Sequence, residues 1–110
     1  MSQISRTPDA PYYAVIFTSR RTDTDPEGYE KTARRMEELA AQQPGFLGLE
    51  SARNMDGPGV TVSYWESLEA IRMWKVQVEH LAAQERGKST WYQAYAVRIA
   101  KVERAYGTEI

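Results

Sequence analysis

Apolar and polar positions along the chain change between strand and helix spacing, and this pattern predicts alternating strands and helices. Residues 12–19, YYAVIFTS, are aromatic or β-branched and apolar on both faces, as in a central strand. Asp25 followed by Pro26 is typical of a helix start, and Pro44 with Gly45 ends the helix. Its apolar stripe, at three- and four-residue spacing, consists of Tyr29, Ala33, Met36, Leu39 and Ala40.

The second half of the chain is predicted to contain a hairpin of two strands, a helix and a last strand. Residues 46–53 and 60–66 are predicted strands, and the Asn, Asp, Gly and Pro residues of 54–59 form the turn between them. Ser67 is a suitable cap for a second helix, and residues 91–104 form a last strand. The predicted core stripe of the second helix is Leu68, Ile71, Trp74, Val78, Leu81 and Ala82.

The resulting order, β-α-β-β-α-β, is that of the ferredoxin-like fold, an antiparallel sheet with two helices on one face. We predict a flexible N-terminal arm over residues 1–11 and a single α+β domain over residues 12–110. The uncovered face of such a sheet would still display large apolar side chains. A second copy of the chain is the simplest cover, so a homodimer is expected.

The composition limits which partners are expected for the protein. The 110 residues carry 14 basic and 15 acidic side chains without a basic cluster, so nucleic acid is not expected as a partner. No run of about 18 apolar residues is present, so no membrane span is expected. The chain has no cysteine, which excludes thiolate chemistry and fits a cytoplasmic location.

Three pieces of the chain are distinctive through their order and spacing. They are PGFLGLES (44–51), YWESLEAIRMW (64–74), and EHLAAQERG (79–87) with the WYQAY and VERAYG that follow it. Together they resemble the antibiotic biosynthesis monooxygenase superfamily, whose members are dimeric α+β barrels. The resemblance covers residues 12–107 and is more specific for the fold than for the reaction.

The resemblance implies a cofactor-independent monooxygenase that oxidises a small phenolic or quinol-like aromatic compound. In such a reaction no cofactor is needed, because the substrate itself supplies the electrons. The same fold also serves a different class of protein, a non-catalytic module that binds a small apolar or aromatic ligand. Oxygen uptake with a panel of quinols discriminates between these two functions.

His80, the single histidine, is the candidate catalytic residue. Its ordinary pKa of about 6.5 would allow it to accept a phenolic proton near neutral pH. On an unbroken helix His80 lies opposite the core stripe, together with Met73 and Val76. A break near the β-branched Val76 and Val78, as resembling proteins often have, would turn it inward. The other interpretation is a structural one, in which His80 caps or hydrogen-bonds a short second helical segment.

Trp74, Tyr64 and Asn54 are the candidate substrate-binding residues. Trp74 and Tyr64 would form the walls of a flat slot between helices and sheet, although aromatic rings in small domains more often belong to a core or an interface. Asn54 would donate a hydrogen bond to a substrate carbonyl, although its first role is in the hairpin turn.

A haem-binding or haem-degrading protein is the third alternative. In resembling haem-degrading proteins the axial histidine follows a tryptophan by ten residues, and the corresponding position after Trp74 is Gln84. Glutamine is a poor axial donor to iron, so haem is disfavoured unless a helix break moves His80 into that place. The sequence contains no cluster of metal-binding side chains, so no other metal site is predicted.

Overall fold

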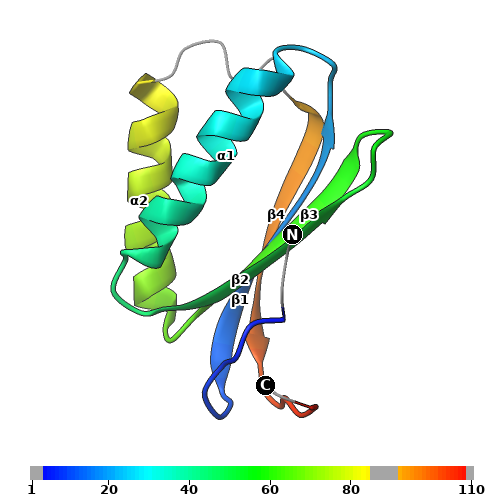
Figure 1. The fold of residues 1–110 in the computed structure, drawn as a ribbon. Helices are drawn as coiled ribbons and strands as arrows, with labels where there is room; N and C mark the ends of the chain where they lie inside the picture. Colours follow the sequence, from blue (N-terminus) through cyan, green and yellow to red (C-terminus); the bar gives the residue numbers. More distant parts are fainter. Residues whose placement is uncertain (1–3, 85–91, 109–110) are drawn as a thin grey trace.

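The computed structural model describes residues 4–84 and 92–108, with the side chains of residues 80–84 outside the described part. Strands β1 (Tyr12–Arg21), β2 (Phe46–Arg53), β3 (Pro58–Trp65) and β4 (Tyr92–Val102) and helices α1 (Pro26–Ala41) and α2 (Leu68–Gln84) follow each other in the order β-α-β-β-α-β (Figure 1). The strands form one antiparallel sheet in the order β2-β3-β1-β4. The predicted ferredoxin-like fold is therefore confirmed.

The helix starts follow from local side-chain chemistry. Asp25 is the N-cap of α1, and its Oδ1 accepts a hydrogen bond from the backbone N–H of Gly28 at 3.1 Å, with Pro26 in the first turn. The hydroxyl of Ser67 accepts a hydrogen bond from the backbone N–H of Ala70 at 3.0 Å. Both predicted helix starts are therefore confirmed, and they fix where the helices leave the sheet.

The core lies between the helices and strands β1, β2 and β3 of the sheet. Trp65 is fully buried, and its ring stacks on that of Trp74 with centroids 5.8 Å apart, while Phe46 meets Trp65 edge-on at 5.5 Å. The prediction that Leu68 belongs to the core stripe of α2 is wrong, because this first residue of the helix is 55% exposed. The remaining buried members of the core are Ala40, Ala70 and Ile71.

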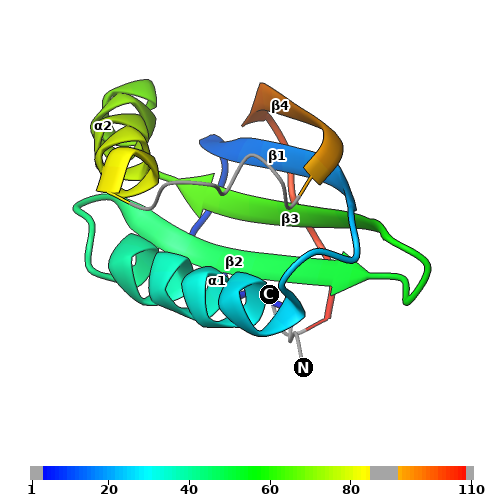
Figure 2. The same cartoon turned by 90° about the horizontal axis from the view of Figure 1, so that it is seen from above.

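Strand β4 is covered less than the other strands on this face. Helix α1 contacts β2 and helix α2 contacts β3, and β4 lies at the edge of the sheet away from α1 (Figure 2). Tyr95, Val97 and Ile99 lie opposite the helix-facing residues of β1 in the strand register, yet they are 65%, 53% and 54% exposed. This leaves an apolar surface on the helix side of β4.

The segment of residues 4–11 lies against the opposite face of the sheet. The backbone N–H of Ser5 donates to Glu50 at 2.9 Å, and its hydroxyl donates to the carbonyl of Leu49 at 3.2 Å. The hydroxyls of Thr7 and Tyr12 are 2.9 Å apart. These contacts join residues 4–11 to β1 and β2.

Truncation of the central ring tests this description of the core. We expect Trp65→Ala to lower the free energy of unfolding by about 3 to 5 kcal/mol, because it removes a fully buried ring and leaves a cavity between the helices and the sheet. Urea unfolding measures the change. Met55→Ala, at a residue with a fully exposed side chain, is the control and should differ from wild type by less than about 0.5 kcal/mol. Equal stability of both variants would contradict this core.

Candidate functional site

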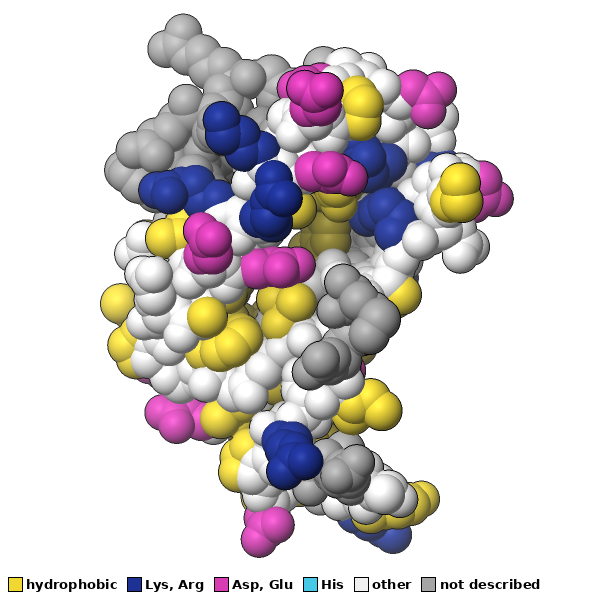
Figure 3. All heavy atoms as spheres, in the orientation of Figure 1, with side chains coloured by type: hydrophobic (Ala, Val, Ile, Leu, Met, Phe, Trp, Pro, Cys, Tyr) yellow, Lys and Arg dark blue, Asp and Glu magenta, His cyan; other side chains and the backbone are white. Residues whose placement is uncertain are grey.

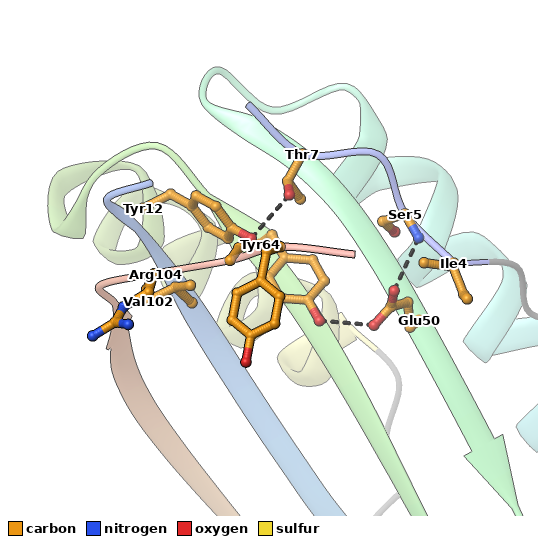
Figure 4. A pocket seen from close by; sticks show the side chains of 10 residues that line it. Ile4, Ser5, Thr7, Tyr12, Glu50, Tyr64, Val102 and Arg104 are labelled. Atoms are coloured by element: carbon orange, nitrogen blue, oxygen red, sulfur yellow. Dashed lines mark hydrogen bonds between the residues drawn. The ribbon is translucent and has the colours of Figure 1, made fainter. Parts of the chain in front are cut away.

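A pocket of about 340 Å³ lies on the face of the sheet opposite the helices. It is lined by the arm that contains Ser5, by the side chains of Tyr12, Tyr64 and Glu50, and by residues 104–106 (Figure 4). The rings of Tyr12 and Tyr64 meet edge-on with centroids 5.8 Å apart. The pocket is therefore a partly aromatic depression between the arm and the sheet.

The polar groups beneath this pocket bind one another. The hydroxyl of Tyr64 donates to Glu50 Oε1 at 2.7 Å, while Glu50 Oε2 accepts from the backbone N–H of Ser5. Burial, followed by the hydrogen bond and the negative charge of Glu50, raises the pKa of Tyr64 to about 12. Tyr64 is therefore a protonated donor at neutral pH, and its hydrogen bond serves to hold the arm and β2 together.

A second candidate site lies on the helix side of the sheet, at the end of β1. Four rings, which we call the aromatic cluster, gather there: Phe17, Tyr29, Tyr92 and Tyr95. The ring centroid of Tyr92 is 5.5 Å from that of Phe17 and 5.9 Å from that of Tyr29, which belongs to the first turn of α1. In this region Figure 3 shows a hollow between α1 and the sheet, with apolar side chains in its depth and basic side chains beside it.

Two arginines, Arg21 and Arg53, adjoin the aromatic cluster. The guanidinium carbon of Arg21 lies 3.7 Å from the ring centroid of Tyr29, and that of Arg53 lies 5.7 Å from the same centroid. Burial and Tyr29 raise the pKa of Tyr92, whereas the positive charges of Arg53 and Arg21 act in the opposite direction. The helix-side site thus combines flat apolar surfaces with fixed positive charge.

The hairpin between β2 and β3 holds both arginines in place. The carbonyl of Gly57 accepts hydrogen bonds from the backbone N–H of Arg21 and from Nη1 of Arg53. Nη2 of Arg53 reaches across β3 to the hydroxyl of Ser19. It can do so because Gly59 lies between them, where a Cβ atom would come within 2.7 Å of the Arg53 guanidinium carbon.

Asn54 belongs to the turn that supports this arrangement. Its backbone N–H donates to Pro58 at 2.8 Å, its carbonyl accepts from Gly57 at 3.1 Å, and its side chain is exposed. The structure thus gives Asn54 the turn role that the sequence suggested first. Its predicted contact with a substrate carbonyl stays a prediction.

Trp74 and Tyr64 do not share a slot. Trp74 packs on Trp65 in the helix-side core, whereas Tyr64, which precedes Trp65 in β3, lies in the pocket on the other face. Because successive side chains of a strand point to opposite faces, the expectation that both rings wall one helix-to-sheet slot is wrong. Their separate roles in substrate binding stay predictions.

Helix α2 is continuous from Leu68 to Gln84, and the break considered near Val76 is absent. At 100° per residue, position 80 therefore shares a helix face with Met73 and Val76, which are 53% and 55% exposed. Gln84 lies in the same helix, ten residues after Trp74. The side chain of His80 lies outside the described part, so its catalytic role stays a prediction.

Sequence reasoning missed the residues of the helix-side site. It assigned Phe17 and Tyr92 to strands without a function, and it assigned neither Arg21 nor Arg53 a role. A usable signal is the placement of an arginine at the end of each of the strands β1 and β2. That both arginines lie at the same site also depends on the strand order of the sheet, which the sequence pattern alone does not give.

Two further observations concern ligands and membranes. Among the residues with described side chains, no three His, Cys, Asp or Glu residues are grouped so that they could hold a metal ion. Within residues 4–84 and 92–108, no helix is long and apolar enough to cross a membrane.

The family model described as antibiotic biosynthesis monooxygenase matches residues 11–86, and the chain belongs to this family. A relative with high identity is the uncharacterized protein YqjZ of Bacillus subtilis (strain 168), 58% identical over 104 residues, which cover 94% of this chain and 90% of that protein. The jasmonate monooxygenase ABM of Pyricularia oryzae is 25% identical over 92 residues, which cover 82% of this chain and 43% of that protein.

Solved structures agree on the fold. A mutant of SnoaB, a cofactor-independent oxygenase from Streptomyces nogalater, superposes with a TM-score of 0.70 at 18% identity over 87% of this chain and 97% of that one. A dimeric ferredoxin-like protein of unknown function from Thermobifida fusca gives a TM-score of 0.66 at 12% identity over 91% and 100% of the two chains. At these identities the likeness shows the fold alone.

Tyr64→Phe tests the hydrogen bond beneath the pocket. We expect it to lower the free energy of unfolding at pH 8 by about 1 kcal/mol, because Glu50 loses a partly buried donor. As pH rises from 10 to 12, the unfolded chain loses the Tyr64 proton before the folded protein does, so wild-type stability falls in this window. The fall should be smaller in Tyr64→Phe, measured by urea unfolding.

The control for this prediction is Tyr106→Phe, at a ring that is 85% exposed. Its stability should follow that of the wild type at pH 8 and throughout pH 10 to 12. If Tyr64→Phe also follows the wild type over this range, Tyr64 carries no shifted pKa and the proposed bond to Glu50 is absent.

Proposed function

We propose that the protein is a cofactor-independent monooxygenase that oxidises a small phenolic or quinol-like aromatic compound at the helix-side site. The observation that carries this proposal is the aromatic cluster, which lies where the helices leave β4 partly uncovered. Flat apolar walls with few polar groups suit a planar aromatic ligand. Relatives named as oxygenases support the reaction class.

The helix-side site suits a substrate better than the pocket on the other face. In that pocket Tyr64, Glu50 and Ser5 satisfy each other's hydrogen bonds. At the helix-side site two positive charges adjoin the rings, and a positive charge favours ionisation of a phenol. The helix side therefore offers both a surface for the ring and stabilisation of the phenolate.

The chemistry needs only the substrate and dioxygen. A phenol whose keto tautomer carries a ring CH₂ group loses its acidic proton and passes one electron from the phenolate to O₂. Combination of the resulting radicals at the ring carbon forms a C–O bond, and cleavage of the O–O bond leaves a carbonyl. One oxygen atom enters the product, the other leaves as water with the two C–H hydrogens, and the substrate supplies all four electrons.

We retain His80 as the proposed proton acceptor. An imidazole with a pKa of about 6.5 is suited to general base catalysis near neutral pH. Because position 80 lies on the face of α2 that carries Met73 and Val76, this role requires the phenolic hydroxyl to be reached from that face. The proposed role of His80 therefore does not depend on that of the aromatic cluster, and the two are tested separately.

We further propose that the protein is a homodimer in the cytoplasm. The face of the sheet opposite the helices carries apolar side chains such as Val60, which is 37% exposed, and association of two sheets would cover this face. A structural neighbour is described as a dimeric ferredoxin-like protein, which supports this assembly. The cytoplasmic location is supported by the absence of cysteine from the sequence.

Oxygen uptake with a panel of quinols and naphthols tests the site. We expect wild type to consume one O₂ per product and to place one ¹⁸O atom from ¹⁸O₂ in the new carbonyl. Tyr95→Ala should lower kcat/KM by about two- to tenfold, because a ring contact of this kind contributes about 0.5 to 1.5 kcal/mol. Tyr106→Ala, another exposed tyrosine on the opposite side of the sheet, is the matched control and should retain the wild-type value.

Uptake at background for wild type with every compound would contradict the monooxygenase and favour the non-catalytic binding module. Turnover that falls equally in Tyr95→Ala and Tyr106→Ala would contradict the placement of the substrate on the aromatic cluster.

A separate variant tests the base. We expect His80→Ala to lower kcat by about a hundredfold or more at pH 7 and to abolish the rise of activity between pH 5.5 and 7.5, because loss of a general base costs about 10²- to 10⁴-fold. Gln77→Ala, at an exposed position of the same helix, should leave both unchanged. An unaltered pH profile in His80→Ala would refute the role of His80 while leaving the aromatic site untouched.

A further inference from the structure

The guanidinium group of Arg21 is buried without a hydrogen-bond partner on two of its nitrogens. Nε and Nη2 each have less than 1 Å² of accessible surface and no acceptor among the described residues. These two nitrogens lie along one edge of the planar guanidinium group and form the fork with which arginine binds a carboxylate side-on. Buried donors are normally paired, so an unpaired fork is an unusual feature of a folded protein.

The charge of Arg21 is also uncompensated. Among the described residues, no carboxylate forms an ion pair with Arg21 or with Arg53. Both cations face the ring of Tyr29, which attracts them only through its π electrons. Two positive charges close together, one with unpaired buried donors, raise the free energy of the folded protein. A bound anion would offset this cost.

The surrounding contacts keep the arginines in this position. The backbone N–H of Arg21 is bound to Gly57 at 3.1 Å, and the head of Arg53 is bound to Gly57 and Ser19. The Nη atoms of Arg53 thus have partners, and its charge adds to that of Arg21. The unpaired Nε and Nη2 of Arg21 are therefore the donors that a ligand can bind.

We propose that this site selects aromatic acids: the carboxylate of the ligand binds the Nε and Nη2 fork of Arg21, and its ring lies on the aromatic cluster. Arg53 adds attraction without a direct bond. The inference deepens the proposed function by naming the substrate class of the same site, and it rests on that function only for turnover. Because the fork is covered, entry of the carboxylate displaces a covering side chain, as binding often does.

Isothermal titration calorimetry under nitrogen tests the proposal with 2-naphthoate and its neutral isostere 2-naphthamide. We expect 2-naphthoate to bind wild type at least tenfold more tightly than 2-naphthamide, because hydrogen bonds to charged groups are the strong ones. Arg21→Met keeps the length of the side chain and removes the fork. It should reduce the affinity for 2-naphthoate at least tenfold and leave that for 2-naphthamide within about twofold.

The matched control is Arg98→Met, on the opposite face of the sheet beside Ile16. It should bind 2-naphthoate as wild type does. Arg21→Met should be at least as resistant to urea as wild type, because it removes an unpaired buried cation. If Arg21→Met unfolds, Arg21→Lys replaces it, and the same loss is expected because a lysine cannot form the fork.

Equal binding of 2-naphthoate and 2-naphthamide, or equal binding of 2-naphthoate to wild type and Arg21→Met, would overturn the proposal. Inorganic phosphate that binds as tightly as 2-naphthoate would also overturn it, because the ring would then contribute nothing. The titration needs no turnover, so selective binding without oxygen uptake would refute the monooxygenase and leave this inference intact.

Discussion

The stack of Trp65 on Trp74 is the contact on which the arrangement of the molecule depends. These rings, with Phe46 at their edge, fill the space between the helices and the β2–β3 half of the sheet. The same core extends to Tyr13 and Val15 of β1, whereas Tyr95, Val97 and Ile99 of β4 stay exposed on the helix side. The same packing that stabilises the fold therefore provides the surface on which an aromatic ligand can lie.

The two faces of the sheet have different uses in this account. On the face away from the helices, Tyr64, Glu50 and Ser5 satisfy one another and join the arm to β2. On the helix side, Arg21 has a buried fork without an acceptor. Since an unpaired buried donor costs free energy, whereas a paired one does not, the difference points to the helix side as the place where a ligand completes the structure.

Local chemistry was enough to predict much of the fold. Asp25 with Pro26 and Ser67 marked the two helix starts, and the turn residues of 54–59 marked the hairpin. The site was less predictable because it depends on long-range placement. Arg21 and Arg53 come from strands β1 and β2, which flank β3. The Arg53 side chain can cross β3 towards β1 only because Gly59 has no side chain in its way. The face of Tyr64 was misjudged because the prediction did not follow the alternation of side chains from Trp65.

Membership of the antibiotic biosynthesis monooxygenase family fixes the fold and leaves the ligand to the side chains of this chain. The central claim is that the aromatic cluster on the helix side holds an aromatic anion. A crystal structure of the protein soaked with 2-naphthoate tests it most directly. The account predicts a ring beside Phe17 and Tyr92 with its carboxylate on Arg21, whereas a ligand bound only in the pocket of Tyr12 and Tyr64 would contradict it.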